Sequence, residues 1–152
     1  GVLAATLVPM VGKTIEDSRK ARAQSDTKAI VNAIAMYKMV NASYPVGSCA
    51  AGCTSCSAGN PAYNYSHSGG GCGVEGQNVH LISGSRKYLA KAIGSDPWGI
   101  RYSYHIYTLG NPYMDVSVFS NGPNRANETW DGGPWNNGTF NGDDIGALFD
   151  AE

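Results

Sequence analysis

The sequence predicts an α+β protein in which a long N-terminal helix packs on a small antiparallel β-sheet, with a short second helix and a loop-rich C-terminal part. Three observations support this fold class. Apolar residues recur at three- and four-residue steps up to residue 40, as on one face of a helix. Two segments after residue 100 alternate between apolar and polar residues, as strands do. The 20 glycines lie mostly after residue 46, which indicates loops.

The N-terminal segment of residues 1–11 carries no charge. Crossing a bilayer takes about 20 apolar residues, so this segment is too short to do so alone. We expect it to be the second half of a membrane or filament helix whose first half precedes Gly1; a buried core helix or strand would show the same pattern. The residues expected to drive assembly are Val2, Leu3, Leu7, Val8, Pro9 and Val11.

The helix is predicted to continue through residues 13–40. Its apolar stripe consists of Thr27, Ile30, Ile34, Tyr37 and Val40, whereas residues 16–23 are polar or small and give little sign of facing a core. A helix of roughly 40 residues is longer than a small domain can cover, so its surplus must be buried in other molecules.

Two proline positions should interrupt or end this helix. Pro9 lacks an N–H group and is predicted to kink or locally open the helix, with help from Gly12. Tyr44 precedes Pro45, and a residue before proline avoids the α region, so the helix should end there. We divide the chain into a helix half of residues 1–24 and a globular head of residues 25–152.

Four cysteines lie in a Gly- and Ser-rich loop of residues 47–76, which lacks the apolar residues needed to hold itself together. We expect two disulfides and therefore an oxidising compartment. The pairing stays open among three connectivities, and a zinc site is the less favoured alternative because the paired knuckles of structural zinc sites are missing. The cysteines are Cys49, Cys53, Cys56 and Cys72.

The rest of the head should contain a short helix, a turn and a β-hairpin. The helix is predicted over residues 85–93 with Gly94 as its C-cap, and the turn over residues 96–99. Strands are predicted over residues 101–109 and 113–120 as an antiparallel pair, with inward and outward side chains alternating. Residues 121–144 are dominated by Gly, Asn and Asp and are expected to be loop.

These motifs, in this order, resemble the type IV pilin-like proteins, most closely the major pseudopilin of bacterial type II secretion. The resemblance covers nearly the whole chain except the cysteine loop and residues 125–139. The matching stretches are residues 1–5 with Pro9, residues 36–38 with Tyr44 and Pro45, Asp96, Pro97, Trp98 and Gly99 with Tyr102 and Tyr104, residues 115–124, and residues 143–146.

The resemblance implies a structural subunit that polymerises through its N-terminal helix into a helical filament, either a secretion pseudopilus or a closely related surface pilus. The expected partners are further copies, minor pilins or pseudopilins, and an inner-membrane assembly machinery. The chain would sit in the inner membrane with a periplasmic head before assembly, and in a periplasmic or extracellular filament afterwards. The cysteines depart from the usual major-pseudopilin pattern, so the choice between pseudopilus and pilus stays open.

The resemblance also implies a calcium ion in the C-terminal loop, since Ca²⁺ accepts several hard oxygens. Its ligands would be side-chain oxygens of Asn124, Asp143 and Asp144, and carbonyls of Asn121 and Pro123. Asn124 stands where the family often has Asp, which should weaken binding. An Asn- and Asp-rich turn that only bonds its own backbone is the competing interpretation.

No catalytic function is expected. The three histidines are scattered without ligand spacing, and no nucleophile framework is visible, so the sequence offers no catalytic constellation. A balance of 11 Lys and Arg against 12 Asp and Glu gives no electrostatic reason for binding nucleic acid. The alternative to a filament subunit is a membrane-anchored extracellular binding or adhesion module that does not polymerise.

Overall fold

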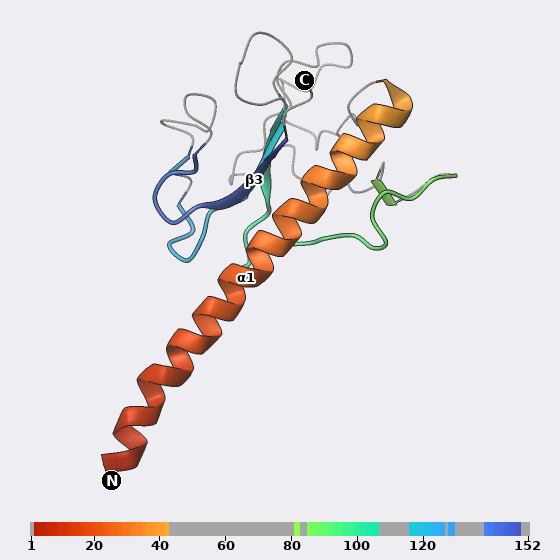
Figure 1. Cartoon of the computed structure of the whole chain (residues 1–152). Helices are drawn as coiled ribbons and strands as arrows, with labels where there is room; N and C mark the ends of the chain where they lie inside the picture. Colours follow the sequence, from red (N-terminus) through yellow and green to blue (C-terminus); the bar gives the residue numbers. More distant parts are fainter. Residues whose placement is uncertain are drawn as a thin grey trace.

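The computed structural model describes residues 2–42, 81–82, 85–106, 116–126, 128–129 and 139–149. They contain one long helix, α1 (Val2–Asn41), and three strands, β1 (Ser103–Ile106), β2 (Val116–Ser120) and β3 (Ile145–Phe149). The predicted α+β class is therefore confirmed. Figure 1 shows the C-terminal half of α1 lying along the sheet and its N-terminal half extending well beyond it.

The three strands form one antiparallel sheet in the order β1-β2-β3. Val118 in the central strand lies opposite Tyr104 of β1 and Ala147 of β3. The predicted hairpin is confirmed by the pairing of β1 with β2, whereas β3 was not predicted. The alternation expected in β2 is wrong, because Ser117, Val118 and Phe119 are all buried. A central strand has neighbours on both edges and here is covered on both faces.

The core lies between the sheet and the C-terminal half of α1. Thr27, Ile30 and Ile34 are fully buried, so the predicted stripe faces the core over these positions. The stripe is wrong at its end, where Val40 is 50% exposed. The first buried residue on the described part of the helix surface is Ala23.

The helix itself runs without a break through Pro9 and Gly12, so the predicted local opening is wrong for this state of the chain. One missing hydrogen bond does not stop a helix that continues for turns on both sides. The helix ends at Asn41, one residue beyond the predicted range of residues 13–40 and before Tyr44, with Ala42 in the left-handed region at φ 54°. The Asn41 side-chain amide donates to the carbonyl of Tyr37 at 2.9 Å and so satisfies a group at the helix end. Within the described part of the chain, no helix combines the length and apolar character that a membrane crossing requires.

The predicted second helix over residues 85–93 is wrong, and Gly94 is not a helix cap. This segment is a series of bends in which the backbone N–H groups of Tyr88 and Leu89 both donate to the carbonyl of Leu81, at 2.7 and 2.9 Å. The Tyr88 ring also packs edge-on against Tyr37 at 5.3 Å. The apolar residues that suggested a helix face instead anchor a loop to α1.

The predicted turn at residues 96–99 is confirmed, and its acid is a buried acceptor. Asp96 Oδ1 accepts hydrogen bonds from the backbone N–H groups of Trp98 (3.0 Å) and Ile100 (2.8 Å). Asp96 Oδ2 accepts from the Ser120 hydroxyl at 2.5 Å. Gly99 takes φ 87°, which glycine adopts without steric cost. One carboxylate therefore joins this turn to the end of β2.

A partly buried hydrogen bond joins α1 to the segment leading into β1. The Tyr102 hydroxyl donates to Asp26 Oδ2 at 2.8 Å, and Arg22 lies 3.5 Å from the same carboxylate oxygen. Burial, and then this hydrogen bond, raise the pKa of Tyr102 well above its usual range. The phenol therefore remains a donor at any physiological pH.

We predict that Asp96→Ala lowers the free energy of unfolding by about 3 kcal/mol, because two backbone donors and one hydroxyl lose a buried acceptor. Urea denaturation followed by circular dichroism measures the change. Asp96→Asn is the matched control, since its amide oxygen can still accept, and should cost less. Equal stability of the wild type and Asp96→Ala would show that the carboxylate does not hold the turn.

Candidate metal site

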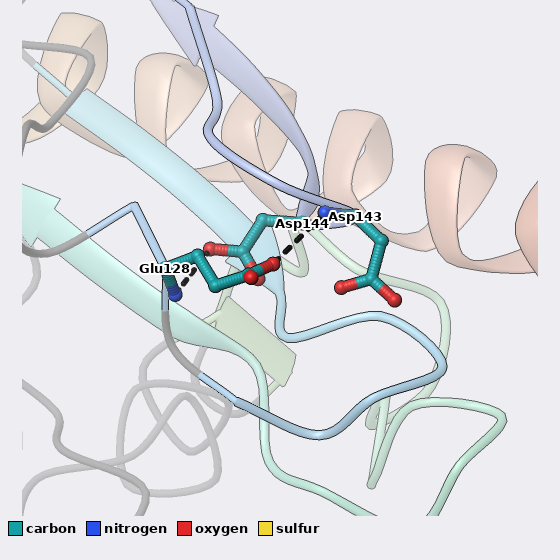
Figure 2. Close-up of side chains that lie close together, drawn as sticks. All are labelled: Glu128, Asp143 and Asp144. Atoms are coloured by element: carbon teal, nitrogen blue, oxygen red, sulfur yellow. Dashed lines mark hydrogen bonds between the residues drawn. The ribbon is translucent and has the colours of Figure 1, made fainter.

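Three carboxylates gather at one end of the sheet. One oxygen each from Glu128, Asp143 and Asp144 lies within 4.8 Å of the others, and Figure 2 shows the three side chains close together. Asp143 and Asp144 directly precede β3, and Glu128 lies in the segment after β2. Because Ser120 at the end of β2 pairs with Ile145 at the start of β3, the antiparallel register brings these two segments together.

Two glycines allow the segments to approach so closely. Gly122 has φ 66° and Gly142 has φ 59°, a region that other residues rarely adopt. A Cβ atom on Gly122 would collide with the carbonyl of Asp143, and one on Gly142 would collide with the carboxylate of Glu128. Gly122 therefore requires glycine for space as well as for backbone conformation, whereas a side chain at Gly142 would displace the carboxylate of Glu128.

The carboxylates are oriented by backbone N–H groups. Asp144 Oδ2 accepts from the N–H groups of Glu128 (3.2 Å) and Thr129 (2.7 Å). Glu128 Oε2 accepts from the N–H of Asp143 at 3.0 Å, and Asp143 Oδ2 accepts from the N–H of Asn124 at 3.1 Å. Each acid thus uses one oxygen to bind the loop that carries another member of the cluster.

The opposite oxygens of the two aspartates are buried without a partner. Asp143 Oδ1 and Asp144 Oδ1 accept no hydrogen bond, and neither side-chain atom of the fully buried Asn121 is paired. Asp144 is only 9% exposed. An ionised oxygen that has lost water without gaining a partner is costly, and a bound cation or a proton at these atoms would lower that cost.

The pKa directions separate the members of the cluster. Burial raises the pKa of Asp144, against the lowering effect of its hydrogen bonds from Thr129 and Glu128. The pKa of Glu128 is lowered, first by the hydrogen bond from the backbone of Asp143. The fold alone therefore compensates the charge of Asp144 less than that of Glu128.

The geometry fits a hard divalent cation. Ca²⁺ binds oxygens at about 2.3–2.6 Å, so two ligands of one ion lie no more than about 5 Å apart, and the three carboxylates meet that limit. A cation here would neutralise acids that otherwise repel one another and would supply a partner to the unpaired oxygens. The donor set favours a metal that prefers oxygen over one that prefers sulfur or imidazole.

The sequence-predicted ligands differ in burial and in their place relative to the acidic cluster. Asp143 and Asp144 are in the cluster. Asn121 is buried and Pro123 half-buried nearby in sequence, but Asn124 is exposed and its side-chain oxygen accepts from the N–H of Ala126 at 2.7 Å. Asn124 also contacts the cluster, because its backbone N–H donates to Asp143 Oδ2 and its side chain is hydrogen-bonded to Glu128. Glu128 was missed, because it lies in the stretch of residues 125–139 that matches nothing in the resembling family.

Other predicted residues lie partly outside the described part of the chain. This holds for the cysteine loop with Cys49, Cys53, Cys56 and Cys72, so neither disulfides nor their pairing can be placed. The assembly residues Val2, Leu3, Leu7, Val8 and Pro9 belong to α1, but their side chains are outside the description. Val11 is described, and it is 55% exposed.

Comparison with known proteins adds no assignment: no family model, no curated protein and no solved structure matches this chain.

We predict that millimolar Ca²⁺ raises the melting temperature of the protein by about 5 °C or more and that a chelator reverses the shift, as expected for a ligand that binds only the folded state. Asp144→Asn should abolish the shift. Without metal, this variant should be at least as stable as the wild type at pH 7, because an amide avoids burying a charge. Differential scanning calorimetry measures both effects.

The matched control is Asp17→Asn, which removes an exposed acid on the far half of α1 and should keep the full calcium shift. A wild-type melting temperature that does not respond to Ca²⁺ or chelator would rule out the metal site. Loss of stability in metal-free Asp144→Asn would instead show a purely structural carboxylate.

We also predict that the calcium shift is larger at pH 7 than at pH 4. The pKa of Asp144 is raised in the folded state, so without metal its contribution to stability is complete below its unfolded pKa and is lost as pH rises through the folded pKa. The metal needs the ionised form and therefore gains affinity over that same interval. Melting curves with and without Ca²⁺ across this pH range test it, and a shift of equal size at both ends would contradict it.

Proposed function

We propose that the protein is a structural subunit that polymerises through α1 into a helical filament, a type II secretion pseudopilus or a closely related type IV pilus. The observation that carries the proposal is the stem, defined as residues 11–22 of α1. Every stem residue is exposed except the half-buried Glu16. The helix has 40 residues and so spans about 60 Å, but the first buried residue along its described side chains is Ala23.

A stem of this kind is poorly explained as part of an isolated molecule. In proteins, a helix owes most of its stability to the packing of one face against other elements. The stem lacks such packing in this chain, since Val11 and Ile15 are 55% and 49% exposed. In a filament, each stem would lie among the stems of other copies and bury these side chains, which the hydrophobic effect favours by about 25 cal/mol per Å². Heads would then form the outer shell.

The arrangement of the head supports the same proposal. The C-terminal half of α1 packs on an antiparallel sheet, and its N-terminal half extends beyond the head (Figure 1). A pilin fold requires this arrangement. The acidic cluster at the start of β3 suits the calcium ion of that family, with Glu128, Asp143 and Asp144 as carboxylate ligands. Bound calcium would fix the loops before β3, and the ligands would hold it without catalytic chemistry.

The proposal includes a location and partners. Before assembly, the subunit would lie in the inner membrane with its head in the periplasm. An inner-membrane assembly machinery and minor subunits would be its partners when it enters the filament. Pro9 has no N–H group, so the carbonyl four residues earlier lacks its helical hydrogen bond. Although α1 is continuous in this structure, its helical hydrogen bonding is weakest there, and the helix could open locally at this position during the transfer.

The test is electron microscopy of the purified full chain and of Leu7→Asp and Val8→Asp variants. The wild type should form filaments and the variants should not, because an acid buried among apolar stems has no partner. The head should melt at the same temperature in all three, since these positions lie beyond it.

Ser85→Asp, an exposed change on the head, is the control and should leave filament yield unaltered. A wild type that stays monomeric under every condition would favour the anchored binding module instead. Normal filaments from the two aspartate variants would show that the apolar N-terminal segment is not the assembly element.

A further inference from the structure

Thr129 is fully buried and bonds to both ends of the turn that carries two of the cluster's acids. Its backbone N–H donates to Asp144 Oδ2 at 2.7 Å, and its hydroxyl is hydrogen-bonded to the same carboxylate. The hydroxyl also accepts from the backbone N–H of Asn141 at 3.1 Å. The turn itself is closed by the N–H of Asp144, which donates to the carbonyl of Asn141 at 3.1 Å.

The hydrogen bonds of the Thr129 hydroxyl have a fixed direction. A backbone N–H only donates, so the hydroxyl uses a lone pair for Asn141, and its single proton is left for Asp144. An ionised carboxylate only accepts, so it is the matching partner for that proton. The branched Cβ of threonine also restricts rotation about χ1. The hydroxyl therefore presents its proton steadily to Asp144.

The donors around Asp144 leave one of its oxygens bare. Oδ2 accepts from Thr129 and also from the N–H of Glu128 at 3.2 Å, whereas Oδ1 is buried and has no hydrogen-bond partner. A carboxylate held through one oxygen cannot turn freely, so the other oxygen keeps one direction. A hard cation needs ligand oxygens that are oriented but not already paired.

We propose that Thr129 is a positioning residue of the metal site, whose hydroxyl holds the Asp144 carboxylate and keeps Oδ1 available to the cation. This inference rests on the calcium site of the proposed function and names a residue that acts through one of its ligands. Because Thr129 follows Glu128 directly, the segment after β2 would supply one carboxylate ligand and orient another. Hydrogen-bond partners of this kind commonly set metal affinity, and their loss costs about 10- to 100-fold.

Calcium titration of the full chain by isothermal titration calorimetry tests this role. Thr129→Val replaces the hydroxyl by a methyl group and should weaken Ca²⁺ binding about tenfold or more. Thr129→Ser keeps the hydroxyl and should bind Ca²⁺ within about twofold of the wild type, although loss of the buried methyl group lowers its melting temperature. The two variants therefore separate the orientation of Asp144 from the stability of the head.

The matched control is Thr27→Val. Thr27 is also fully buried, but its hydroxyl donates to the carbonyl of Gln24 within α1 at 3.1 Å, so its loss should leave calcium affinity unchanged. Amide hydrogen exchange in the wild type gives a second measurement if Thr129→Val does not fold. Ca²⁺ should slow the exchange of the Asn141 amide more than that of Trp98, which donates to Asp96.

Three results would overturn the positioning role and leave the metal site intact. They are unchanged affinity in Thr129→Val, an equal loss of affinity in Thr129→Ser or Thr27→Val, and an Asn141 amide that responds to Ca²⁺ no more than that of Trp98. A wild type that takes up no Ca²⁺ would instead remove the calcium site itself, and the role of Thr129 with it.

Discussion

The rest of the structure depends on the packing of the C-terminal half of α1 against the sheet. Ile30 and Ile34 of the helix are completely buried with Val118 and Tyr102 in one cluster. The hydrogen bond from Tyr102 to Asp26 adds a partly buried polar contact near the N-terminal limit of this packing. A domain of this size can cover only part of a 40-residue helix, and residues 11–22 remain exposed apart from the half-buried Glu16.

The sequence predicted the elements whose signal is local. Periodic burial made the helix recognisable through Ile34, and proline and glycine marked the turn that begins at Asp96. It failed where tertiary contacts overrode the pattern. Tyr88 and Leu89 looked like a helix face because apolar spacing is the same whether the side chains face a core from a helix or anchor a loop. The strand β3 is short and contains Gly146, so it showed no alternation.

The candidate site was predictable only in part for the same physical reason. Asp143 and Asp144 are neighbours in sequence and stand out in an Asn- and Gly-rich tail. Glu128 joins them because β2 and β3 pair in a register that brings their flanking loops together, and single-sequence patterns do not contain that register. Asn124 combines both interpretations, since its side chain accepts a hydrogen bond within a local turn and is also hydrogen-bonded to Glu128 of the cluster.

The hydrogen bond from the Gln24 side chain to the carbonyl of Gly146, at 3.0 Å, has a mechanical consequence. Gln24 sits where the stem leaves the head, and Gly146 lies two residues after Asp144. In the proposed filament, tension along the stem would pass through this contact into β3, beside the acidic cluster. The loops that a bound ion would hold together lie next to this contact. An ion in the proposed site would therefore resist the separation of β3 from the rest of the head.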